Sequence, residues 1–236
     1  VVSQIHRSPG VIFSHEKGVY SSRIIPYRGS WLEFEIDQKR DLIYAKIDRK
    51  KRILGTLFLR ALGYDTREKI IALFYRSEQA DLKDSRELRE QLSGRVLATA
   101  VFVKDADGNQ RKMYRAGEKI HPHDIDELLR NDVNQVQLID DEQEESLHAD
   151  IILNCFEREE SKFVGEDADR DEPSKEDAIT AIYAVLQPGE PITMESAERD
   201  FLSMFFSSRR YDLGRVGRYK LNKKFDYAEP PEDYIL

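Results

Sequence analysis

Cysteine and long hydrophobic runs are what this chain has least of. Cys155 is the only cysteine among 236 residues, so no intrachain disulfide can form, and a reducing cytoplasm is expected. No apolar run approaches the roughly 18 residues that a membrane-spanning helix needs, so no membrane contact is expected. The sequence starts on Val-Val, without Met and without a basic-then-apolar signal layout, as an excised region of a longer protein would.

Motifs for phosphate or metal chemistry are also scarce. No Walker-type Gly-Lys-Ser/Thr sequence occurs. The run Asp105-x-Asp107-Gly108 echoes a calcium loop but lacks the twelve-residue ligand pattern, so a tight hairpin turn is favoured. His121 and His123 supply two imidazoles, whereas zinc needs three or four converging ligands. Surface histidines at the start of a helix are therefore the favoured reading, and no metal site is expected.

One pair has the residue types of a nucleophile and a base. Cys155 with His148 suits that chemistry, but nothing in the sequence orients the pair. A small apolar cysteine beside Leu153 and Phe156 is favoured. A hydrolase that uses Cys155 remains an alternative, for which Cys155→Ala would abolish activity.

The charge of the chain is high and unevenly spread. Charged residues make up 35% and the formal net charge is -8, which argues against a general nucleic-acid binder. Yet residues 39–52 and 207–224 each hold seven Lys or Arg, against two Asp and one Asp respectively. The acidic residues are concentrated at 140–145 and 157–177. Because local potential, and not the sum, attracts phosphate, one face could still hold DNA.

Residues 1–80 are predicted to form strands followed by helices. Apolar alternation at 31–36 and 41–48 predicts two strands, with 37–40 as a hairpin connection. Residues 53–62 predict a short apolar helix that ends at Gly63. Thr66 can cap a further helix.

Residues 81–165 are predicted to form an inserted, β-rich module. Residues 166–236 are predicted to be helical and to follow an acidic, solvated linker at 157–177. Ser174 and Asp177 have capping-box spacing before an apolar run at 178–186, and Thr193 opens another helix. The expected fold class is α+β. The elements predicted for the module are a helix at 82–92, a strand at 96–103, a turn at 105–109, a continuation at 113–117, a helix at 125–129 and a strand at 133–139.

Four separated blocks, in order, carry a family resemblance. They are Val2–Val11; Arg23–Glu35; Ile47–Lys51 with Leu59–Tyr64; and Gln187–Pro191 with Arg210–Leu213 and Val216–Lys220. On these blocks the chain resembles the lobe region of the bacterial RNA polymerase β subunit. The module at 81–165 looks like a lineage-dependent insertion, whose role does not follow from the family.

The resemblance implies a function without a complete active site. Such a lobe forms one wall of the DNA cleft in a DNA-directed RNA polymerase, a nucleotidyltransferase. Catalytic Mg²⁺ belongs to the partner subunit, so this fragment is expected to hold no cofactor and to be non-catalytic. The implied partners are DNA, the β′, α and ω subunits, and sigma and elongation factors, in the bacterial cytoplasm at the nucleoid. The alternative is mainly a docking surface for transcription factors, with little direct DNA contact.

The resemblance also implies roles for individual residues. Arg7 borders a pocket for a non-template base, and Trp31 stacks on a neighbouring unpaired base. An indole is a sequence-tolerant stacking platform, and a guanidinium binds phosphate or guanine in bidentate fashion. On residue type alone, Trp31 could instead be core and Arg7 could pair with a carboxylate. The remaining implied contacts are Arg49, Lys50 and Lys51 facing the DNA, Arg218 near single-stranded DNA, and Val2 and Gln4 at the edge of the rifamycin-type inhibitor pocket.

The chain departs from the family pattern at two positions. The family pattern has a further stretch of residues between Gly18 and Val19, which this chain lacks. Any DNA contact made by that loop is therefore in doubt here. At position 194 the family pattern suggests a basic residue, whereas this chain has Met194. The contact that a basic side chain would make there is not expected in this chain.

Overall fold

The computed structural model describes residues 7–83, 85–105, 108–140, 149–163, 172–189, 191, 193–228 and 235–236. Over these residues the chain forms two compact units. Unit 1 comprises Val1–Gly63 and Asn154–Leu236, and unit 2 comprises Tyr64–Leu153. The predicted limits of the module, 81 and 165, thus differ from the limits of the spatial units.

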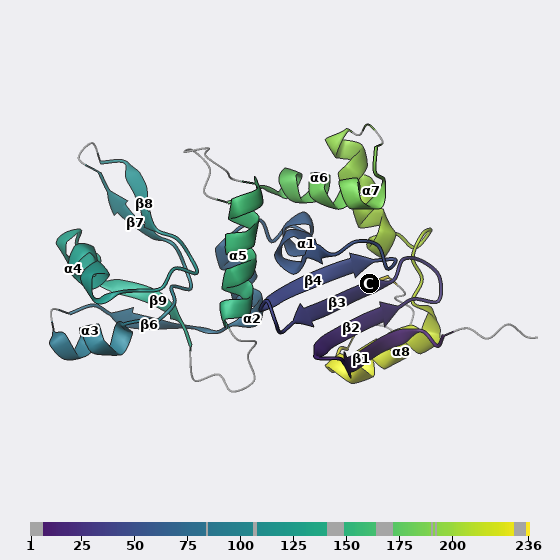
Figure 1. Cartoon of the computed structure of the whole chain (residues 1–236), viewed down its shortest axis with the longest axis horizontal. Coiled ribbons are helices and arrows are strands. Elements are labelled where there is room, and N and C mark those ends of the chain that lie inside the picture. Colours follow the sequence, from purple (N-terminus) through teal and green to yellow (C-terminus); the bar gives the residue numbers. More distant parts are fainter. Residues whose placement is uncertain are drawn as a thin grey trace, which may run out of the picture. The chain divides into compact units, whose positions relative to one another are not determined.

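Unit 1 is built on an antiparallel sheet whose five strands follow one another in chain order (Figure 1). The strands are β1 (Gly10–Glu16), β2 (Val19–Ile25), β3 (Leu32–Asp37), β4 (Leu42–Ile47) and β5 (Ile53–Leu54). The predicted β3–β4 hairpin is confirmed, with Asp37 paired to Leu42. Residues 53–54, predicted as the start of a helix, are extended because Ile53 pairs with Ala45 of β4.

The loop that the family pattern leads one to expect after Gly18 is replaced by a tight turn. Glu16 pairs directly with Val19, so only two residues connect β1 to β2. Lys17 and Gly18 have φ values of 53° and 77°. Two-residue hairpin turns of this kind need positive φ at both positions, because only that twist matches the flanking strands.

Helices complete unit 1, and they pack through a cluster of aromatic side chains. Phe58 makes edge-on contacts with Phe34 of β3 at 5.6 Å and with Phe201 at 5.6 Å between ring centroids. Such pairs add to the free energy that burial of the rings already provides. The helices are α1 (Gly55–Ala61), α5 (Ala149–Phe163, in unit 1 from Asn154), α6 (Lys175–Leu186), α7 (Met194–Phe206) and α8 (Gly214–Phe225), the last of which contacts β1.

An ion cluster whose central pair, Arg60 and Glu159, is fully buried lies among these helices. Arg60 of α1 is 0% exposed and donates from Nε to Glu159 of α5 at 3.0 Å. Its other nitrogens reach Glu172 at 3.1 Å and the carbonyl oxygen of Pro173 at 3.3 Å. One guanidinium therefore joins α1, α5 and the segment that leads into α6.

The prediction of a solvated linker from Glu157 onward is wrong for its first part. Residues 157–163 are the last turns of α5. Glu159 is 0% exposed and follows Ile152, Cys155 and Phe156 on the buried face. Its charge is tolerated there because Arg60 compensates it, which composition alone does not reveal. Residues 164–171 lie outside the described residues. The Ser174–Asp177 capping box before α6 is confirmed.

Unit 2 is a smaller α+β body, and the α+β fold class is confirmed for the chain. Its two sheets pair β6 with β9 and β7 with β8, both antiparallel. Leu97, Ile125 and Leu138 lie at the centre of its core. Thr66 caps α2 by accepting the Lys69 N–H, as predicted. The elements are α2 (Arg67–Phe74), β6 (Ser77–Asp81), α3 (Arg86–Leu92), β7 (Val101–Lys104), β8 (Gln110–Tyr114), α4 (Pro122–Arg130) and β9 (Gln135–Ile139).

In the described part of the chain, no helix has the length and apolar character to cross a membrane. The strand predicted at 96–103 is shorter than expected. Only Val101–Lys104 belongs to a strand, while Val96 and Leu97 form isolated bridges to Lys119 and Leu138.

Removal of the Arg60 side chain should destabilise unit 1 strongly. Arg60→Ala leaves the Glu159 carboxylate buried without its partner, and loss of one member of a buried pair typically costs about 3–5 kcal/mol. Urea unfolding followed by the fluorescence of Trp31, the single tryptophan, measures the free energy of unfolding. The control is Arg199→Ala, which removes an ion pair of 3.9 Å between side chains that are 70% and 45% exposed. It should change that free energy by less than about 0.5 kcal/mol. Equal effects of the two substitutions would contradict the role given to Arg60.

Candidate nucleic-acid interface

A strained turn follows β4 and carries the basic run, residues 49–52. Asp48 and Arg49 have φ values of 49° and 60°, in the left-handed region that costs L-residues roughly 1–2 kcal/mol each. The N–H of Lys50 closes the turn on the carbonyl oxygen of Ile47 at 2.9 Å. Strain of this kind persists only where surrounding contacts impose it, and it is concentrated at functional positions.

Asp48 provides the contacts that hold this turn. Its N–H donates to the carbonyl oxygen of Trp31 at 3.0 Å, and its carboxylate accepts the N–H of Trp31 at 2.8 Å. Asp tolerates the left-handed region better than most residues, because its short polar side chain bonds locally. The turn after β4 is therefore tied at two points to the residue just before β3.

The indole of Trp31 lies beneath two guanidinium groups. Its side chain is half-buried, unlike that of its neighbour Leu32, which is 2% exposed. The guanidinium carbon of Arg49 lies 4.7 Å from the ring centroid and that of Arg7 lies 6.0 Å from it. Both distances are within the range of cation–π attraction. The structure thus brings together three of the predicted site residues: Arg7, Trp31 and Arg49.

The loop before Trp31 is fixed to residues 207–224, the second of the two lysine- and arginine-rich segments and here called the second basic strip (residues 39–52 being the first). Arg28 and Asp212 exchange two backbone hydrogen bonds, of 3.0 and 2.8 Å. Gly29, with φ of 124°, lies so close to Tyr211 that a Cβ at this position would be 2.8 Å from the Tyr211 ring. Only glycine permits this approach without displacement of the buried tyrosine.

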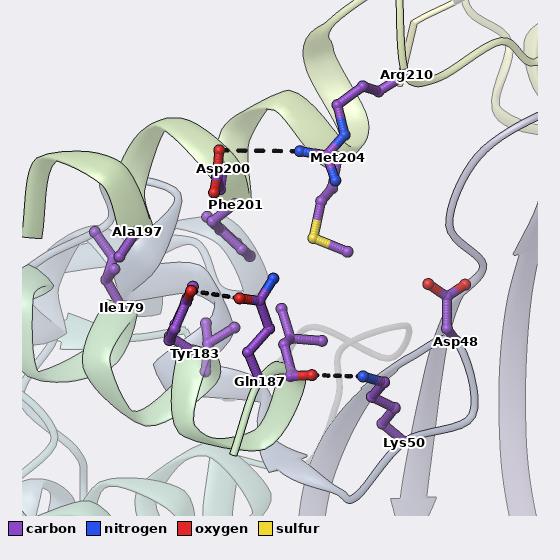
Figure 2. A pocket seen from close by; sticks show the side chains of 12 residues that line it. Asp48, Lys50, Ile179, Tyr183, Gln187, Ala197, Asp200, Phe201, Met204 and Arg210 are labelled. Atoms are coloured by element: carbon purple, nitrogen blue, oxygen red, sulfur yellow. Dashed lines mark hydrogen bonds and ion pairs between the residues drawn. The ribbon is translucent and has the colours of Figure 1, made fainter. Parts of the chain in front are cut away.

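Lys50 lines a small cavity of about 150 Å³ together with Arg210, which belongs to the second basic strip. The Lys50 ammonium donates to the carbonyl oxygen of Leu186, at the end of α6, at 2.5 Å. Figure 2 shows this bond and, across the cavity, the Arg210 guanidinium near Asp200, with which it forms an ion pair of 4.0 Å. Cations from both strips therefore meet at one cavity.

The remaining cations differ in how far their charge is compensated. Lys51 is exposed. Arg52 pairs with Glu35 at 3.0 Å and with Asp37 at 3.5 Å, and it stacks over Tyr44. The charge of Arg52 is thus balanced within the sheet, and the outward-facing part of the run is residues 49–51.

Arg218 differs from the other predicted contact residues because it is buried. It is 4% exposed and donates to the carbonyl oxygen of Ile235. Burial raises the pKa of Tyr211, and the charge of Arg218 opposes that rise. The predicted role of Arg218 beside single-stranded DNA is not favoured by this burial. Val2 and Gln4 lie outside the described residues, and Met194 opens α7 with 36% exposure.

The sequence motifs that suggested metal binding or a nucleophilic cysteine have other structural explanations. Among the residues that the structure describes, no group of three His, Cys, Asp or Glu could hold a metal ion. His121 and His123 stack 5.7 Å apart at the start of α4. Asp105 accepts the N–H of Asn109 at 2.8 Å in a tight turn. Cys155 is 0% exposed, and desolvation raises the pKa of its thiol to about 12.

Two residues of the site were missed by sequence reasoning. Asp48 lies in the predicted strand at 41–48 and in the family block Ile47–Lys51, but no role of its own was predicted for it. Its position directly after a strand, before Arg49, was an available sign of a turn residue. Arg210 was counted in the second strip, but the pairing of Arg28 with Asp212 that brings it to Lys50 has no signal in the local sequence.

Comparison with known proteins identifies close relatives. The family described as RNA polymerase Rpb2, domain 2, matches residues 3–158 and 154–236. The chain is 66% identical over 229 residues to the DNA-directed RNA polymerase subunit beta of Treponema denticola, covering 97% of this chain and 20% of the relative. The same subunit of Treponema pallidum is 58% identical over 241 residues, covering 100% and 20%. For Borreliella burgdorferi the identity is 51% over 235 residues, covering 97% and 20%. The chain thus spans about a fifth of the length of these relatives.

The Cys155 thiol should be unreactive in the folded chain. At pH 8, labelling by a disulfide reagent should be at least roughly a hundredfold slower than in urea, because the thiolate is the reactive form. The folded pKa is raised to about 12 from an ordinary 9.0. Stability from the protonated thiol is therefore complete below pH 9 and is lost as pH rises toward 12. Rapid labelling of the native chain at pH 8 would instead support a nucleophilic cysteine.

Proposed function

The chain belongs to the RNA polymerase Rpb2 domain 2 family and is part of an RNA polymerase β subunit. From this premise we propose that it forms the lobe of a bacterial DNA-directed RNA polymerase and lines the DNA cleft. In this role it contacts the non-template strand and downstream duplex. The observation that carries the proposal is the Trp31 ring with Arg49 and Arg7 over it, next to the exposed Lys50 and Lys51.

The chemistry of this arrangement suits an opened duplex. A half-buried indole is held in place, yet an unpaired base can stack on its face in place of the guanidinium of Arg49, an exposed residue. The displaced guanidinium can then bind the adjacent phosphate with two parallel hydrogen bonds. Lys50 and Lys51 add phosphate contacts that do not depend on base sequence.

The proposal assigns no chemical step to this chain. In the whole nucleotidyltransferase, catalytic Mg²⁺ is bound by the partner subunit, and the present residues bind and orient DNA. We expect no primer extension by the isolated chain. The proposed partners are DNA, the β′, α and ω subunits, and sigma and elongation factors, at the nucleoid in the bacterial cytoplasm. Val2 and Gln4 remain predicted edges of the inhibitor pocket.

A charge swap in the whole enzyme tests the downstream contacts. The double substitution Lys50→Glu and Lys51→Glu should shorten the lifetime of promoter complexes. It should also lower the salt slope of binding by about one unit for each phosphate that is no longer neutralised by a lysine. Lys39→Glu, in the turn at the opposite end of the β3–β4 hairpin, is the control and should leave both quantities nearly unchanged. If the double variant behaves like the control, residues 50 and 51 do not contact DNA.

A second test distinguishes base stacking on the Trp31 ring from a general effect of losing this side chain. In the whole polymerase, Trp31→Ala should weaken binding of forked DNA with unpaired non-template bases by about 1–3 kcal/mol. Trp31→Phe should retain most of that affinity because it keeps an aromatic face. Binding of fully paired duplex is the internal control and should change little in either variant. Equal weakening on forked and paired DNA by Trp31→Ala in a polymerase that still assembles would exclude the proposed stacking.

A further inference from the structure

Lys50 also lines a second cavity in unit 1. It has a volume of about 720 Å³ and is formed by the basic turn, the end of α5 and the outer face of α6. This volume lies in the range of ligand sites in proteins, roughly 300–1,000 Å³. None of the roles proposed above for DNA uses α5 or α6. The residues that matter for its chemistry are Lys50, Lys51, Lys162, Phe163, Ala184 and Val185.

The floor of this cavity is apolar. α6 uses Ala178, Ile179 and Ile182 for the core, which leaves another side of the helix toward the cavity. Ala184 is exposed there, whereas Val185 and Phe163 of α5 are half-buried and also pack against the core. Short side chains on a helix surface leave room for a bulky side chain from a partner.

The rim of the cavity is positively charged. Lys50, Lys51 and Lys162 are all exposed. Lys50 makes one bond to Leu186, and an ammonium has three donors, so its capacity is not exhausted. The carboxylate in the lining belongs to Asp177, which accepts the N–H and the hydroxyl of Ser174, both at 2.9 Å, as part of the α6 cap. Its charge is therefore largely offset at the N-terminus of the helix.

From this pairing of an apolar floor with a lysine rim, we propose that the cavity docks an acidic segment of a protein partner that carries a bulky apolar side chain. Carboxylates of the segment pair with the three ammonium groups, and the apolar side chain lies against Ala184 and Val185. A nucleic acid would satisfy the lysines but would leave Ala184 and Val185 without a complementary group, and the Phe163 ring already has the Lys162 ammonium 4.9 Å from its centroid. The floor therefore favours a peptide over a polyphosphate.

One consequence concerns DNA. Lys50 and Lys51 belong both to this rim and to the proposed DNA-facing run, so the acidic segment and DNA exclude one another at these two lysines. This consequence alone rests on the proposed function. Lys162 belongs only to the cavity, and it therefore separates the two activities.

The test uses the 236-residue chain and a rhodamine-labelled synthetic peptide in which Glu and Asp surround one Phe and one Leu. Fluorescence anisotropy measures its Kd. Lys162→Glu should raise the Kd roughly fivefold to tenfold, because a favourable exposed pair becomes a repulsive one. Lys39→Glu makes the same change in net charge away from the cavity and should alter the Kd less than about twofold. Replacement of Phe and Leu by Ser in the peptide should weaken binding at least as much as Lys162→Glu.

The outcomes separate this inference from the proposed function. Equal effects of Lys162→Glu and Lys39→Glu, or unchanged affinity of the Ser peptide, would overturn the docking site. So would an effect of Lys162→Glu on DNA binding without any binding of the peptide, which would assign the cavity to nucleic acid. If the peptide binds as expected but duplex DNA fails to displace it, the docking site stands and the DNA contact of Lys50 and Lys51 fails.

Discussion

The guanidinium of Arg60 joins α1 to two segments of unit 1 that lie about a hundred residues further along the chain. It pairs with Glu159 of α5, 99 residues away, and with Glu172 and the Pro173 carbonyl oxygen at the approach to α6. A buried cation requires such partners, because water cannot compensate its charge. The positions of α5 and α6 on the sheet are therefore coupled to a single side chain of α1.

The site depends on this arrangement through a short series of contacts. α6 starts just after Pro173 and ends at Leu186, whose carbonyl oxygen accepts the Lys50 ammonium. Lys50 belongs to the turn in which Asp48 binds the backbone of Trp31. The buried ion cluster, the end of α6, the basic turn and the indole thus form one connected series. In the same series Lys50 lines two cavities, one with residues of α7 and one with residues of α5.

Local patterns predicted the elements whose determinants are local. The alternation of β3 and β4, the Thr66 cap and the Ser174–Asp177 capping box were all readable because their partners lie within a few residues. The end of α5 was misread because the partner of Glu159 is distant in sequence. Likewise, β5 is extended only because β4 is beside it.

The site was only partly accessible to sequence reasoning. Arg7, Trp31 and Arg49 followed from the resemblance to the polymerase family and not from their spacing, and the structure brings them together. The burial of Arg218 could not be predicted, since nothing in α8 marks one of its several cations for the interior. The lysine-rimmed cavity was not predicted either, because Lys162 lies in the stretch that was predicted to be a solvated linker.

The central claim is that the Trp31 ring lies against an unpaired base of the non-template strand. Its most direct test is photocrosslinking in the whole polymerase with Trp31→p-benzoylphenylalanine in promoter complexes. The account predicts a crosslink to the non-template strand in the open complex and none to the same position of closed duplex. A crosslink only to protein, or one that does not depend on DNA opening, would contradict the account.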